Sequence, residues 1–111
     1  MRKIKIPLDN VVIGSDTIEE HKMQVLNFMN MIYDIAFCGA NRDNIDPWFF
    51  NLKYEISCIR WEKYYTTYAF HIEQHIDILK EKVLNKQCTE KDWNNVLESI
   101  AEIFEIKYTL N

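Results

Sequence analysis

The chain has 111 residues, of which 48% are apolar and 27% charged, and its formal net charge is −4. This balance excludes a disordered chain, and the length gives room for one domain with one core. The acidic excess argues against a nucleic-acid-binding protein, which usually carries a basic excess. Only two Gly and two Pro are present. All-β folds need frequent turn residues, so this scarcity predicts long helices.

The cysteines and the apolar runs indicate the cell compartment. Cys38, Cys58 and Cys88 are odd in number and form no Cys-x-x-Cys pair, so we expect free thiols in a reducing compartment. Residues 1–7 lack the apolar core of a signal peptide. No apolar run approaches the roughly 20 residues of a membrane span. We therefore expect a cytoplasmic protein, without membrane association and without a cofactor.

Residues 1–14 predict an extended segment. Lys3 to Ile6 alternate polar and apolar side chains, which indicates a short strand that Pro7 ends. Val11 to Ile13 predict a second extended piece, stopped at Gly14.

Residues 15–38 predict the first helix. Ser15, Asp16 and Thr17 are three possible N-caps, and Gly39 is suited to the position after the helix. The helix has a central apolar stripe. After Val25, only a narrow strip of the helix surface is polar. The stripe consists of Ile18, Val25, Met29, Ile32 and Ala36, and the polar strip of Asn27, Asn30 and Asp34. Such a helix is either central in a bundle or covered by a second chain, and the second alternative predicts a homodimer.

Residues 46–87 predict one long helix or a pair of helices. Asp46 and Pro47 form a cap followed by a first-turn proline, and residues 48–86 contain no Gly or Pro. Nine apolar or aromatic residues keep one helical phase, which favours a single helix; a break near Thr66 and Thr67 is the alternative. The nine residues are Tyr54, Cys58, Trp61, Tyr65, Tyr68, Ile72, Ile76, Leu79 and Val83.

Residues 89–105 predict the last helix, with Thr89 as its cap. Its expected apolar face is Trp93, Val96, Leu97, Ile100 and Phe104. The alternating residues 104–110 are compatible with pairing to the Lys3–Ile6 strand. The expected fold is mainly α: one domain that forms a small three- to four-helix bundle with a short N-terminal extended segment, possibly paired with the C-terminal tail.

Three histidines suggest a metal site. His71 and His75 stand four residues apart on one helix face, and His21 on the first helix is suited to supply a third nitrogen. The residue after His71 is Ile72 rather than the Glu of zinc proteases, and no Glu precedes a histidine by three residues. The alternative is that these are ordinary boundary histidines.

Other chemistry has weaker support. Cys88, close to the start of the last helix, is the best placed thiol for nucleophilic catalysis, but no base can be assigned to it. With Gly only at positions 14 and 39, the chain cannot build a glycine-rich phosphate loop.

Charged and aromatic residues predict recognition surfaces. Acidic and basic side chains flank opposite edges of the predicted long stripe, an arrangement that orients a neighbouring helix or a partner chain. The last helix carries an acidic row. The predicted partner-binding residues are Lys53, Arg60, Trp61, Tyr64 and His71 on the long region and Glu98, Glu102 and Glu105 on the last helix.

These patterns favour a non-catalytic protein-interaction module: a small inhibitor or adaptor that binds and blocks another protein, of the immunity or anti-defence type found in bacteria and phages. The first alternative is a metal-binding helical protein that uses His21, His71 and His75. The second is a nucleic-acid-binding accessory protein that uses Arg2, Lys3 and Lys5 with the Lys53, Arg60 and Lys82 edge.

Overall fold

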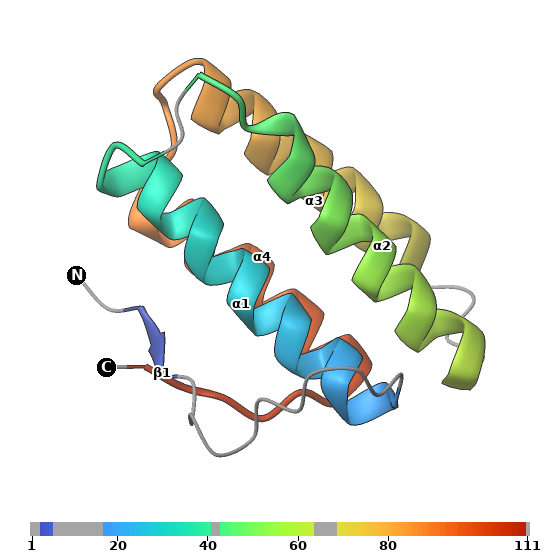
Figure 1. Cartoon of the computed structure of the whole chain (residues 1–111). Helices are drawn as coiled ribbons and strands as arrows, with labels where there is room; N and C mark the ends of the chain where they lie inside the picture. Colours follow the sequence, from blue (N-terminus) through green and yellow to red (C-terminus); the bar gives the residue numbers. More distant parts are fainter. Residues whose placement is uncertain (1–2, 6–16, 41–42, 64–68, 111) are drawn as a thin grey trace.

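The computed structural model describes residues 3–5, 17–40, 43–63 and 69–110, and of residues 60–63 and 69–70 it describes the backbone alone. The predicted helical fold is confirmed: within these ranges four helices pack together, and a two-stranded antiparallel sheet pairs the N-terminal with the C-terminal segment (Figure 1). The elements are β1 (Ile4–Lys5), α1 (Ile18–Phe37), α2 (Asp46–Lys63), α3 (Ala69–Leu84), α4 (Glu90–Phe104) and β2 (Thr109–Leu110).

Helix α1 begins and ends where its sequence predicts. Among the three possible caps the structure uses Thr17, whose Oγ1 accepts a hydrogen bond from the Glu20 N–H at 3.3 Å. The helix ends before Gly39, whose φ of 80° is costly for any residue with a Cβ atom. The extended piece predicted at Val11–Ile13 lies outside the described residues.

The strongly apolar helix α1 is packed within the helix bundle. It packs chiefly against α2 and also contacts α4 and β1, and its Val25, Met29 and Ile32 are fully buried. Of the two alternatives for such a helix, the central position is the one observed. The homodimer stays a prediction.

The polar strip of α1 holds β1. The Asn30 carboxamide donates from Nδ2 to the Ile4 carbonyl and accepts at Oδ1 from the Ile4 N–H, both at 2.8 Å. Asp34, one turn later, pairs with Lys3 at 2.8 Å. Ile4 and Lys5 then pair with Leu110 and Thr109, which confirms the predicted pairing of the two chain ends.

The long helical region is two helices, so the single long helix favoured by its sequence is wrong and the two-helix alternative is correct. Helix α2 and helix α3 run antiparallel (Figure 1), and the predicted break at Thr66–Thr67 lies outside the described residues. The nine-residue stripe is correct for α3, where Ile72, Ile76 and Leu79 are buried.

In α2 the predicted phase is wrong. Its buried side chains are Phe49, Leu52, Ile56 and Ile59, whereas Tyr54 is 57% exposed. Because the chain turns back after α2, each of the two helices has its own phase, and the face of α2 that meets α1 determines which residues are buried.

Helix α4 completes the core. Thr89 and Asp92 form a reciprocal capping box, and all five residues of the predicted apolar face are buried. The indole Nε1 of Trp93 donates to the Met29 carbonyl of α1 at 2.9 Å. No helix within the described ranges is long and apolar enough to cross a bilayer.

Candidate functional site

Helices α2 and α3 present large apolar side chains to solvent. Phe50 is 70% exposed, Tyr54 57% and Leu84 53%. We call Phe50 and Tyr54, with the two ion pairs that join α2 to α3, the outer α2–α3 face; Leu84 instead lines a cavity at the end of α3. Phe50 and Tyr54 lie one turn apart on the side of α2 opposite its buried stripe. Solvated apolar side chains gathered on one face are typical of contact surfaces.

Two ion pairs join the helices along this face. Lys80 on α3 contacts Asp46 on α2 at 2.6 Å, and Lys53 on α2 pairs with Asp77 on α3. Phe50 stands between Asp46 and Lys53 along α2. Both pairs hold α2 against α3, and the Lys53–Asp77 pair joins residues from opposite edges of the predicted stripe.

The predicted partner-binding residues are distributed over several places. Lys53 belongs to the outer α2–α3 face, and His71 is exposed near the start of α3. The side chains of Arg60, Trp61 and Tyr64 lie outside the described residues.

The acidic row of α4 is exposed. Glu98, Glu102 and Glu105 all face solvent, as their spacing predicts. The Tyr108 hydroxyl lies near this row, and burial together with the Glu98 charge raises the pKa of Tyr108. The row is a surface of single sign and is separate from the outer α2–α3 face.

The structure brings His21 to α2 rather than to the other two histidines. Its Nδ1 lies 2.5 Å from Oε2 of Glu55, and the Cys58 thiol is close by, so that potential ligand atoms of the three residues lie within 4.8 Å of one another. Across the described part of the chain this is the one group of three or more such residues. His71 and His75 are exposed on α3 and do not join it.

This cluster is largely enclosed. His21 is 8% exposed, and the Glu55 side chain keeps 14% of its surface accessible. His21 lies in the first full turn of α1, where its N–H donates to the Thr17 carbonyl at 3.1 Å. Glu55 and Cys58, three residues apart, share one side of α2. Partial burial of charged groups in this way requires that they have partners.

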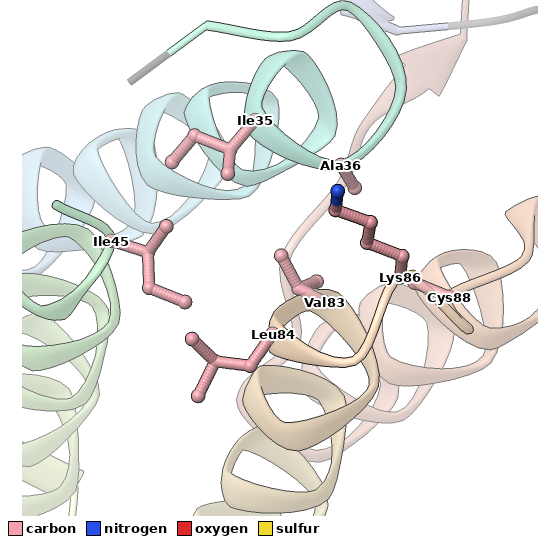
Figure 2. A pocket seen from close by; sticks show the side chains of 7 residues that line it. All are labelled: Ile35, Ala36, Ile45, Val83, Leu84, Lys86 and Cys88. Carbon is pink, nitrogen blue, oxygen red and sulfur yellow. The ribbon is translucent and has the colours of Figure 1, made fainter. Parts of the chain in front are cut away.

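A separate cavity of about 300 Å³ opens between the end of α1, the start of α2 and the end of α3 (Figure 2). Its lining is mainly aliphatic, and the Cys88 thiol forms part of it. Burial and the nearby Asp92 raise the pKa of Cys88 to about 11. The thiolate is the reactive form, so this environment is unfavourable for the nucleophilic role considered for Cys88.

Three of the four described basic residues considered for nucleic-acid binding are paired. Arg2 and the Arg60 side chain lie outside the described residues, and Lys5 is exposed. The others pair with carboxylates as Lys3–Asp34, Lys53–Asp77 and Lys82–Asp92. Each such pair offsets a charge that phosphate contacts would use.

Comparison of the chain with protein-family models, with curated proteins and with the solved structures finds no match.

Sequence reasoning missed Phe50 and Leu84 as surface residues and Glu55 as a partner of His21. Neither Phe50 nor Leu84 belongs to the nine-residue stripe, and their absence from this predicted buried face was the sequence signal that both are exposed. No sequence pattern indicates which residue of another helix Glu55 meets.

Proposed function

We propose that the protein is a non-catalytic interaction module, an inhibitor or adaptor that binds another protein through its outer α2–α3 face. The observation that carries this proposal is Phe50, a large aromatic side chain 70% exposed between two ion pairs. Burial of such a side chain in a partner's pocket contributes roughly 1.5–3 kcal/mol.

The surroundings of Phe50 support this role. An apolar anchor ringed by polar groups is the common arrangement of an interface hot spot, because the rim excludes water from the centre. Tyr54, one turn from Phe50 and 57% exposed, extends the apolar surface along the same side of α2. The face thus offers two aromatic side chains beside two ion pairs.

Paired variants test the proposal. Phe50→Ala removes the anchor, whereas Ile78→Ala removes an aliphatic side chain of 55% exposure on the other side of α3. Protein captured from cells that naturally express the chain is identified by mass spectrometry, and its affinity for each variant is then measured. We expect Phe50→Ala to weaken binding by roughly 30-fold, and Ile78→Ala to change it less than threefold.

Two results contradict the proposal. Equal affinity of both variants, with loss of binding on Glu98→Gln and Glu102→Gln, assigns recognition to the acidic row. A dimer in light scattering that dissociates on Phe50→Ala assigns the face to a second copy of the chain.

A further inference from the structure

We infer that His21, Glu55 and Cys58 form a binding site for a zinc-class divalent ion at the α1–α2 interface. The inference is independent of the proposed function, because none of these three residues belongs to the outer α2–α3 face. It differs also from the three-histidine site suggested by sequence, with which it shares only His21.

The chemistry of the three side chains suits zinc. Zn²⁺ accepts imidazole nitrogen, carboxylate oxygen and thiolate sulfur, and three protein ligands with a water molecule complete a tetrahedral site. The mixture of a thiolate with an imidazole favours a borderline ion over calcium or magnesium, which prefer oxygen ligands.

The geometry is close to that of a bound ion. Ligand atoms in a tetrahedral zinc site are roughly 3.3–3.8 Å apart. Here the His21 and Glu55 atoms are 2.5 Å apart, and all three ligand atoms lie within 4.8 Å of one another. Side-chain movements of about 1 Å therefore reach the required arrangement without displacement of either helix.

The scaffold holds these positions firmly. Helices α1 and α2 form the most extensive helix contact of the fold, and the core residues Val25 and Ile59, each one turn from a ligand, are fully buried. Ligands on two packed helices keep their spacing better than ligands on loops.

The charges also balance. The Glu55 carboxylate and a Cys58 thiolate carry two negative charges beside a neutral His21 imidazole, and a divalent ion neutralises them in this enclosed place. Binding releases the thiol proton, and a second proton wherever the imidazole is charged, so affinity increases with pH.

Cobalt titration of the full chain, produced without a histidine tag and kept reduced, tests the site. Co²⁺ bound to a thiolate gives a near-ultraviolet charge-transfer band, and tetrahedral Co²⁺ absorbs in the visible. We expect both to saturate at one equivalent of Co²⁺ per chain and to disappear when Zn²⁺ is added.

Matched variants locate the ligands. Cys58→Ser should abolish the charge-transfer band, while Cys38→Ser and Cys88→Ser should retain it. His21→Gln and Glu55→Gln should each weaken Co²⁺ binding at least 10-fold, because even loss of a supporting contact costs 10–100-fold. His75→Gln should leave the affinity unchanged. Circular dichroism checks that each variant is folded.

A second readout covers variants of reduced stability. Zn²⁺ should raise the midpoint of thermal unfolding of the parent protein but not that of Cys58→Ser, since only a ligand of the folded state stabilises it. The inference is overturned if the parent protein shows no thiolate band. It is equally overturned if the band survives Cys58→Ser, or if binding is lost only when His71 and His75 are replaced.

Discussion

The Asn30 side chain takes the place of a neighbouring strand for Ile4, accepting from its N–H and donating to its carbonyl at 2.8 Å each. A residue of α1 thereby satisfies both backbone groups of a strand residue. This contact and the Lys3–Asp34 pair connect the small sheet to the helices.

Replacement of Asn30 should therefore loosen the sheet. We expect Asn30→Ala to lower the free energy of unfolding by about 2 kcal/mol, since two hydrogen bonds of about 1 kcal/mol each are lost. Asn27→Ala is the control, because its amide donates to Gln24 at the exposed surface, and it should cost less than about 0.5 kcal/mol. Urea unfolding measures both. Faster amide exchange at Lys5 and Thr109 in Asn30→Ala alone would locate the effect, and equal costs for both variants would contradict it.

Glu105 should be a site of stabilisation. It ends α4 with φ of 56° and ψ of 47°, a left-handed conformation that glycine adopts without the Cβ clash. We expect Glu105→Gly to raise the free energy of unfolding by about 1 kcal/mol. Glu98→Gly removes the same charge from the interior of the same helix and should lower it by about 1 kcal/mol. Thermal unfolding of the two variants should shift in opposite directions, and a shared direction would refute the assignment of strain to residue 105.

The Asp92 carboxyl should make the free energy of unfolding depend on pH in the acid range. The hydrogen bond from Lys82, followed by those from the Thr89 backbone and side chain, lowers the pKa of Asp92 from 3.8 to about 2. Because the folded-state pKa is depressed, this contribution is complete above pH 3.8 and is lost as pH falls toward 2.

Urea midpoints across this pH range test the effect. The difference in stability between the parent protein and Asp92→Asn should be constant near neutrality and should shrink below pH 3.8. Lys82→Met should flatten the same acid-side slope by removing the largest cause of the shift. An Asp92→Asn difference that persists unchanged to pH 2 would rule out the linkage.

Cys88 should resist alkylation in the folded protein. Its pKa of about 11 leaves little thiolate at pH 8, whereas Cys38 is exposed. Mass spectrometry after a short iodoacetamide treatment should find Cys38 labelled well before Cys88. In urea both should react at similar rates, which shows that the fold causes the difference. Fast labelling of Cys88 in the native state would restore it as a candidate nucleophile.

Local signals in the sequence predict most of this fold, because they depend on residues near one another in the chain. Thr17, Gly39 and Thr89 act as the caps and stops that their residue types favour. The stripe through Ile72, Ile76 and Leu79 is likewise a property of one helix.

The features that sequence does not predict depend on long-range packing. The phase of α2 is set by its contact with α1, so Phe49 and Leu52 are buried while Tyr54 is exposed. The pairing of His21 with Glu55 joins residues 34 positions apart, and only the packing of α1 on α2 brings them together.

The register of Ile4 opposite Leu110 determines how the protein responds to a pulling force. Tension applied at the two chain ends pulls the paired strands apart from one end of the sheet. The hydrogen bonds between the strands are therefore loaded and broken one after another. The buried Ile4 side chain and the two hydrogen bonds between the Ile4 backbone and Asn30 would be the next contacts to break, before any helix is loaded. A tether attached at these ends should therefore record a small first extension at low force, well ahead of the unfolding of the helical core.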